Sequence, residues 1–504
     1  MGRTGARRLR GCWRSGDRGG RLQRCPDSTQ AARAGGGQAR TSDGCSDRSS
    51  ERGDRTVGQG HGTLALEVNR SIRAVLLGTF LLRFSTGLAG GLLAIYLARL
   101  PAHGGPHVLA IVAGIVGAAY FAAELSLSPV FGVLADRLGA HRVMQWGPIF
   151  GIAAVLMRGV TPSGIELGIL IGTGIFVWLG ITRFLEGAAA GSSIPSILGY
   201  IALATSGDEA IRGRAVARFE AATLAGLGVG LAVSGQLFDL MGANAFFVNA
   251  VLYGLAYAVY RWGVAEIAGS EPASSAGGAD RFSWRRYREA LVGSHVMLLA
   301  PTWIALNAVI GSWSSVSIFQ LMSEPNASFG DQVLNGGLSG TELSVGLSIG
   351  LIVFFAGLFY WGNRFKSYRR TTIIGVGIAG GLAMMAAVFA LNHSQGWGPV
   401  AVAGLVAILL AGLFILAGAT PAALGLLADM TETHPHDRGA VMGLYSVFLG
   451  VGQIVGSLVG GATAQWRGID GLLLGSFVLL LIAILPLRGL RANEHLVGTV
   501  APSG

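Results

Sequence analysis

The sequence contains little charge, almost no lysine and no cysteine beyond residue 45. Only 13% of its 504 residues are charged, Lys366 is the single lysine, and the three cysteines are Cys12, Cys25 and Cys45. Disulfides and thiol chemistry therefore play no part in the rest of the chain. Together with 51% hydrophobic residues and a mean hydropathy of +0.56, this scarcity of charge excludes an ordinary soluble globular protein and indicates a membrane protein.

Sequence signals of other protein classes are missing as well. No His-Glu-x-x-His metal motif is present, and Lys366 follows Phe365 instead of the glycine of a phosphate-binding loop. We therefore expect no cofactor, no metal and no direct use of ATP through that motif. The net charge of +10 lies in a polar tail and in short hairpins, so it indicates membrane orientation and no nucleic-acid partner.

The first 68 residues form a basic tail that we expect to be disordered. They are rich in Arg, Gly, Ser and Asp and show no apolar periodicity, so they cannot bury enough surface to offset the entropy lost on ordering. Their acidic residues argue against a transit peptide, and no apolar stretch follows the basic start, which argues against a secretory signal. An upstream mis-assigned start, with translation beginning at Val68, stays open.

Twelve apolar runs follow the tail. A hydrocarbon core about 30 Å thick requires roughly 20 helical residues, and we expect Gly191 to Pro195 to break or kink the overlong fourth run. The runs cover 73–98, 108–134, 143–160, 165–200, 215–238, 244–261, 291–321, 342–361, 371–391, 399–427, 440–462 and 471–488. We predict an N-terminal six-helix bundle at 69–262, a cytoplasmic linker at 263–289, a C-terminal six-helix bundle at 290–488 and a cytoplasmic tail at 489–504.

Basic residues between these runs predict the orientation. If the N-terminus is cytoplasmic, the outer connections carry only Arg99, Arg158 and Arg467, whereas the inner connections carry many more arginines, including Arg137, Arg142 and Arg364. By the positive-inside rule, both termini are expected in the cytoplasm and the protein in the inner cell membrane. We expect a monomer whose partners are the lipid bilayer, protons and a small-molecule substrate.

A charged hairpin recurs at matching places in the two halves. The first copy runs from Gly132 through Asp136, Arg137 and Gly139 to Arg142, and a degenerate copy spans 361–370. The first copy resembles the loop 2-3 signature of the major facilitator superfamily. This resemblance implies an all-α membrane fold of twelve transmembrane helices in two pseudo-symmetric bundles. It also implies that Asp136 and the basic residues brace the cytoplasmic side and gate alternating access.

The fourth run contains a second match, from Leu179 to Ala190. It resembles the span 4 motif of the same family, with Glu186 where a glutamine is usual, and the family associates the arginine at the position of Arg183 with proton transfer. An arginine in an apolar run is costly unless it faces a wet cavity or a partner, and Arg183 and Glu186 lie one helical turn apart. The alternative is a local ion pair without a role in transport.

Two more charges lie deep in neighbouring runs. Arg83 is about 15 Å from Arg73, and Glu124 is about 18 Å from Asp136, at 1.5 Å per residue. Because their depths match, we expect Arg83 and Glu124 to approach one another near the midplane, where unpaired ions are expensive. Glu124 is the expected proton carrier. The alternative is a pair that only fixes helix packing.

The second half has no mid-depth carboxylate but contains aromatic, amide and hydroxyl side chains. Candidates for substrate contact are Trp303, Asn307, Trp313, Tyr445 and Gln453. Such groups suit an amphipathic or weakly polar solute, although a set of this kind more often serves interfacial anchoring and helix packing.

The sequence thus favours a secondary transporter that exports small amphipathic compounds in exchange for protons. The span 4 match supports export, while span 5 lacks the Gly-Pro pair typical of antiporters in the family. A proton-coupled importer of a sugar or organic acid is the second hypothesis. A membrane-embedded receptor or enzyme is the third, and it has the least support from the motifs.

Overall fold

A computed structural model describes residues 51–206, 209–266, 296–364, 367–433 and 438–493. Contacts divide the chain into residues 1–60 and 61–504, and the second unit is described below. Its described secondary structure consists entirely of helices. The first helix, α1, already begins at Glu51, so part of the segment expected to be unstructured is helical. Most of the predicted linker, at 267–289, and the end of the C-terminal tail lie outside the described residues.

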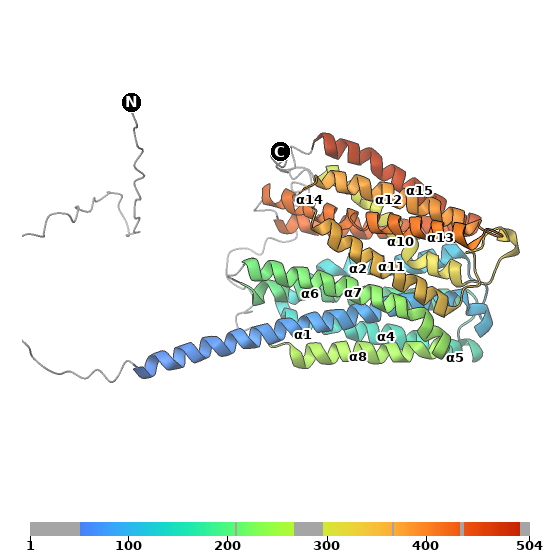
Figure 1. Cartoon of the computed structure of the whole chain (residues 1–504). Helices are drawn as coiled ribbons and strands as arrows, with labels where there is room; N and C mark the ends of the chain where they lie inside the picture. The colour runs from blue at the N-terminus through green and yellow to red at the C-terminus, as the bar shows by residue number, and fades with distance from the viewer. Residues whose placement is uncertain (1–50, 207–208, 267–295, 365–366, 434–437, 494–504) are drawn as a thin grey trace, which may run out of the picture. The chain divides into compact units, whose positions relative to one another are not determined.

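The N-terminal half contains the helices α1 to α8 (Figure 1). Short 3-10 turns, η1 (Leu100–His103) and η2 (Gly242–Asn244), connect some of them. The helices are α1 (Glu51–Ala98), α2 (Ala110–Leu138), α3 (Ala140–Val143), α4 (Trp146–Gly159), α5 (Thr161–Glu166), α6 (Thr173–Ala204), α7 (Glu209–Met241) and α8 (Ala245–Gly263).

The C-terminal half contains α10 to α15 and the 3-10 turn η3 (Ala327–Phe329). Its helices are α10 (Val296–Met322), α11 (Gly340–Gly362), α12 (Arg370–Asn392), α13 (Pro399–Leu416), α14 (Ala419–Thr433) and α15 (Arg438–Ala492). Within α15 the backbone leaves helical geometry only at Arg467 and Gly468. Two predicted spans therefore join there without a loop.

Nine helical stretches in the described residues are long and apolar enough to cross a membrane. The stretches Ile211–Gly263 and Ser446–Ala492 each contain two predicted spans, and the remaining span corresponds to α4, which has only 14 residues. The structure thus accommodates the twelve predicted spans of an all-α, multi-pass membrane protein. The exact domain boundaries, the choice of membrane and the orientation stay predictions.

The fourth run is broken at a different place from the one predicted. The helix α6 continues through Pro195, and the chain instead turns before it, between α5 and α6. Gly168 and Gly172 have φ of 68° and 51° in this turn, a region that favours glycine because it lacks a Cβ atom. The break in the chain thus occurs at two glycines that precede α6, not at the proline inside it.

The helices of the N-terminal half approach one another at glycines. A Cβ atom on Gly187 of α6 would overlap the Tyr120 carbonyl of α2, and one on Gly230 of α7 would overlap the Phe84 carbonyl of α1. Small residues permit such close backbone contact in membrane helices. The charged positions of α1, α2 and α6 are therefore held near one another.

The two halves meet through an apolar cluster at one end, which we call the closed end. Leu92, Tyr96 and Ala110 of the N-terminal half share this cluster with Phe319 and Met322 of the C-terminal half. Because these side chains are 0–5% exposed, water does not pass between the halves at this level.

Hydrogen bonds between the halves reinforce the closed end. The Ala110 amide donates to Oε1 of Gln465 at 2.8 Å, and the Gln236 amide donates to Oγ of Ser344 at 2.8 Å. Asp239 accepts from the Thr341 amide at 2.9 Å, at the start of α11. A negative charge is favourable at a helix N-terminus, so Asp239 latches one half to the other.

Candidate functional site

The described part of the N-terminal half contains a group of five charged side chains within its helix bundle. Arg83 comes from α1, Glu124 from α2, Arg158 from α4, and Arg183 and Glu186 from α6. Together with Tyr120 of α2 we call them the charge cluster. Charges in a membrane interior are retained when they pair with one another or line a wet cavity, and three members of the cluster are paired.

Glu186 is the shared anion of the cluster. Its Oε2 accepts from Nη2 of Arg158 and from Nη1 of Arg183, both at 2.7 Å. Glu186 and Arg158 are completely buried, and Oε1 of Glu186 has no hydrogen-bond partner. Two guanidinium groups therefore share one oxygen of one carboxylate, and this group carries a net positive charge.

The sequence placed Arg158 in an outer connection, and this prediction is wrong. It lies in the last turn of α4 and is 0% exposed. Its Nε donates to Oγ1 of Thr182 at 2.9 Å, and its Nη1 donates to the Ala89 carbonyl at 3.3 Å. The local pair of Arg183 and Glu186, given above as the alternative, is present, but it is one side of a three-residue group.

Arg83 and Glu124 lie in the same cluster without touching. Nη1 of Arg83 donates to the Tyr120 hydroxyl at 3.5 Å, and the Arg183 guanidinium carbon lies 4.5 Å from the centre of the Tyr120 ring. Glu124 attracts both arginines electrostatically. Among the described residues, its carboxylate makes no ion pair or hydrogen bond, and the residue is partly exposed. Arg83 and Glu124 therefore belong to one cluster that includes Tyr120, but they do not form a direct ion pair.

Sequence reasoning also missed Glu220. This residue of α7 is exposed, and its carboxylate interacts electrostatically with Arg83. It lies near the start of the fifth predicted span, where its charge resembles that of an ordinary hairpin residue. The sequence signal that could have identified Glu220 is its position, five residues inside an apolar run.

The residues of the loop 2-3 signature make local contacts. Gly139 has φ of 93°, which requires glycine, and Gly132 lies against Pro195 of α6. Asp136, Arg137 and Arg142 are exposed. Arg142 and His141 lie 3.7 Å from Glu266, and partial burial lowers the pKa of His141. These described contacts stay within the N-terminal half, so bracing between the bundles remains a prediction.

The substrate-contact candidates of the C-terminal half divide into buried and partly buried residues. Trp303 and Asn307 are each 1% exposed, and Nδ2 of Asn307 donates to the Trp303 carbonyl at 2.9 Å. Trp313 is partly buried, with Nε1 donating to Oγ of Ser476 at 2.8 Å, and Gln453 is partly buried. The Tyr445 side chain lies outside the described residues. In this conformation Trp303 and Asn307 pack in the helix core.

Two other features do not contribute a catalytic or transport site. A cavity of about 520 Å³ lies between α12 and α15, but its lining residues Phe389 and Leu474 are about half exposed and would face lipid. The spacing Gly346-Leu-Ser348-Ile-Gly350 resembles a nucleophile elbow. Because Ser348 lies inside α11 and donates to the Ser344 carbonyl at 2.7 Å, it lacks the strand-to-helix turn that such a nucleophile requires.

The sequence of this chain is similar to curated multidrug resistance proteins over part of its length. It is 27% identical over 133 residues to the multidrug resistance protein MdtG of Serratia proteamaculans, covering 26% of this chain and 29% of that protein. It is 24% identical over 198 residues to MdtG of Escherichia coli strain SMS-3-5, covering 39% and 45%. The matches thus span less than half of these relatives.

The fold is similar to that of a solved transporter. A crystal structure of the nucleoside transporter NupG, in a single-residue variant, aligns with a TM-score of 0.58 at 14% identity and covers 83% of this chain and 99% of NupG. At this identity the likeness shows the fold alone. The family model of the Major Facilitator Superfamily matches residues 75–397 and 326–503. The chain is therefore a member of the Major Facilitator Superfamily, a family of transporters and not of enzymes.

Proposed function

We propose that this protein exports small amphipathic compounds in exchange for protons by alternating access. The observation that carries the proposal is the state of Glu124. The residue is partly exposed, and its carboxylate lies in the field of Arg83 and Arg183 without an ion-pair or hydrogen-bond partner among the described residues. A carboxylate in this position can take up and release a proton without breaking the packing around it.

The neighbouring Arg158, Arg183 and Glu186 group has a different role. Glu186 is fully buried and bonded to both arginines, so protonating it would leave two guanidinium groups without their anion. Such a step costs several kcal/mol. We therefore assign the moving proton to Glu124 and the fixed positive field to the Glu186 group. Protonation of Glu124 cancels its attraction to Arg83 and Arg183, which gives the two proton states different preferred helix positions.

Alternating access requires that the halves separate at one end as they close at the other. The closed end, with the Asp239 latch and its apolar cluster, provides one such gate. With both termini in the cytoplasm, the closed end is the outer one, and a solute enters the space between the halves from the cytoplasm. Trp313 and Gln453, which are partly buried, are the remaining candidates to contact it.

The similarity to MdtG supports export, and the span 4 resemblance supports proton coupling. The likeness to NupG supports only the fold, but it gives a reason to include nucleosides among the solutes tested. Import of a sugar or organic acid is the second candidate function. Expression in a sensitive host separates the two, because an exporter raises resistance to unrelated toxic compounds, whereas an importer supports growth on its solute as carbon source.

The decisive experiment is collapse of an imposed pH gradient in proteoliposomes across a panel of solutes. We expect at least one amphipathic compound to dissipate the gradient only when wild-type protein is present, and Glu124→Gln to reduce the rate at least tenfold. Glu324→Gln, which removes an exposed carboxylate outside the spans, is the matched control and should behave like wild type.

A thermal melt of each purified variant shows whether it is folded. Gradient-driven transport by a folded Glu124→Gln protein at the wild-type rate would remove Glu124 from the coupling mechanism. Solute movement that is independent of the pH gradient in wild type would reject proton coupling itself.

A further inference from the structure

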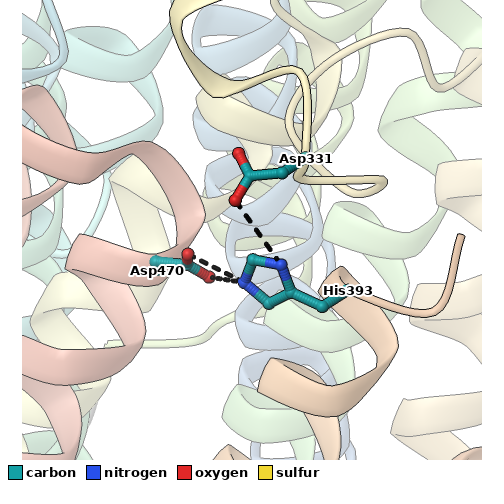
Figure 2. Close-up of side chains that lie close together, drawn as sticks. All are labelled: Asp331, His393 and Asp470. Atoms are coloured by element: carbon teal, nitrogen blue, oxygen red, sulfur yellow. Dashed lines mark hydrogen bonds and ion pairs between the residues drawn. The ribbon is translucent and has the colours of Figure 1, made fainter.

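Three residues from distant parts of the sequence converge in the C-terminal half. Asp331 lies in the connection between α10 and α11, His393 directly follows α12, and Asp470 lies just after the irregular residues of α15. One ligand atom from each lies within 4.8 Å of the others. Figure 2 shows the imidazole ring between the two carboxylates. We call these residues the Asp-His-Asp cluster.

The contact with Asp470 defines the protonation of the ring. Nε2 of His393 lies 2.9 Å from Oδ2 and 3.1 Å from Oδ1 of Asp470. Asn392 donates from Nδ2 to the same Oδ1 at 2.8 Å, as expected for an ionised carboxylate, which only accepts. Nε2 therefore carries the proton and donates it to Asp470. In the neutral ring this leaves a lone pair on Nδ1.

The contact between His393 and Asp331 is then not a hydrogen bond. Nδ1 of His393 lies 3.6 Å from Oδ2 of Asp331, so a lone pair faces a carboxylate oxygen across a gap that is too long for a hydrogen bond. Two atoms bound tetrahedrally to Zn²⁺ at about 2.0–2.1 Å are about 3.4 Å apart. The gap thus has the width and the two acceptors that a small divalent cation requires.

The surroundings hold the cluster in place. The Phe389 ring packs on the imidazole with centroids 4.8 Å apart. Gln332, next to Asp331, donates to the Arg467 carbonyl at 2.9 Å and accepts from the Ile469 amide at 3.0 Å. The Val333 amide donates to the Asn392 carbonyl at 2.8 Å. Each of the three residues is therefore next to a hydrogen bond that joins its segment to one of the other two.

We propose that the Asp-His-Asp cluster binds a divalent transition-metal ion of the Zn²⁺ class. Nδ1 of His393 and the Asp331 carboxylate are its ligands, and water completes the coordination. Asp470 is a positioning residue that fixes the tautomer and orientation of the ring, as carboxylates commonly do behind metal-binding histidines. Mixed imidazole and carboxylate ligation favours Zn²⁺, Co²⁺ or Ni²⁺ over Mg²⁺.

Bound metal would join the connection between α10 and α11 to the ends of α12 and α15. The expectation of no metal arose because the ligands are far apart in the sequence and match no short motif. The site is separate from the charge cluster, and the proposal does not depend on which solute is transported.

The test is isothermal titration of the purified full chain with Zn²⁺, Co²⁺ and Mg²⁺, after removal of any polyhistidine tag. Cys12, Cys25 and Cys45 are replaced by serine in every protein so that tail thiols do not bind the metal. We expect one site for Zn²⁺ and Co²⁺ and at least tenfold weaker binding of Mg²⁺. We expect His393→Ala to lose the site and Asp331→Asn to weaken it at least tenfold.

Two further variants separate ligation from general damage. Loss of such a supporting contact typically weakens metal binding about 10–100-fold, and we expect this for Asp470→Asn. Glu324→Gln, which removes an exposed carboxylate of the same connection, is the matched control and should bind like wild type. A thermal melt in chelator verifies that each variant is folded.

Equal Zn²⁺ affinity of wild type and His393→Ala would overturn the proposal. The proposal would also be overturned if the Asp-His-Asp cluster responded to pH but bound no metal. The His393 ring would then be a doubly protonated imidazolium between two carboxylates.

Discussion

The two halves of this transporter have similar helical frameworks but different interiors. The described spans of the N-terminal half enclose Arg83, Glu124, Arg158, Arg183 and Glu186. At comparable depth, the described spans of the C-terminal half contain amide and hydroxyl groups, such as Asn307, Ser312 and Ser476. At this depth, the charged side chains of the described spans thus lie in one of the two bundles, as the proposed division between proton handling and solute contact requires.

The two interiors also contribute to stability in different ways. Buried ions are expensive unless they are paired, whereas hydroxyl and amide groups can bond to a carbonyl of their own helix. Ser312 and Ser476 do so, donating to Val309 and Leu472 at 2.8 Å. The N-terminal half therefore depends on partners from several helices, and the C-terminal half depends less on any one contact.

The largest expected effect comes from removing the shared anion. Glu186→Gln leaves Arg158 and Arg183 buried without their carboxylate, and breaking a buried pair in this way costs about 3–5 kcal/mol. We expect this loss in the free energy of unfolding, measured by reversible denaturation in mixed micelles. Arg183→Gln is the matched variant, because it leaves Arg158 and Glu186 as a balanced pair, and it should cost less. An equal or larger loss in Arg183→Gln would contradict the assigned charge balance.

An intermediate effect is expected at the closed end. Asp239→Ala removes the acceptor of the Thr341 amide, and a hydrogen bond to a charged group contributes about 1.5–3 kcal/mol. The ratio of closed to open molecules should fall at least tenfold. Maleimide labelling of Ala464→Cys, at a buried position of the shared cluster, measures this opening in a chain without its native cysteines.

Glu342→Gln is the control for the latch, because Glu342 caps α11 through Ser339 in its own half. Labelling should not accelerate in this variant. Equal acceleration in both variants would show that fraying of α11, and not separation of the halves, exposes the label.

The smallest expected effect lies in the C-terminal half. Trp313→Phe and Ser476→Ala each remove the hydrogen bond that Nε1 of Trp313 donates to Oγ of Ser476. A neutral hydrogen bond contributes about 0.5–1.5 kcal/mol to stability. A double-mutant cycle of unfolding free energies should give a coupling of about 1 kcal/mol. A coupling as large as the loss in Glu186→Gln would invalidate the contrast between the two interiors.

The sequence predicted the helices and the family well but the contacts less well. Hydropathy located the spans, and one-turn spacing correctly paired Arg183 with Glu186. Depth along a helix predicted that Arg83 and Glu124 are near, but it does not specify rotation about the helix axis, so the intervening Tyr120 was missed. Arg158 was misassigned because it lies at the end of a short span, where a charge resembles a loop residue. Whether it points inward depends on Thr182 and Glu186, which are 24 and 28 residues away.

The junction inside α15 has a practical consequence. Because the last two spans are separated by only two non-helical residues, Arg467 and Gly468, an epitope or fluorescent tag inserted there would disrupt both helices, and a protease would find almost no exposed chain to cut. The connection at 323–339 has exposed residues such as Glu324 and Ser328. Reporters and antibody epitopes for this face of the protein therefore belong near residue 328, away from Asp331.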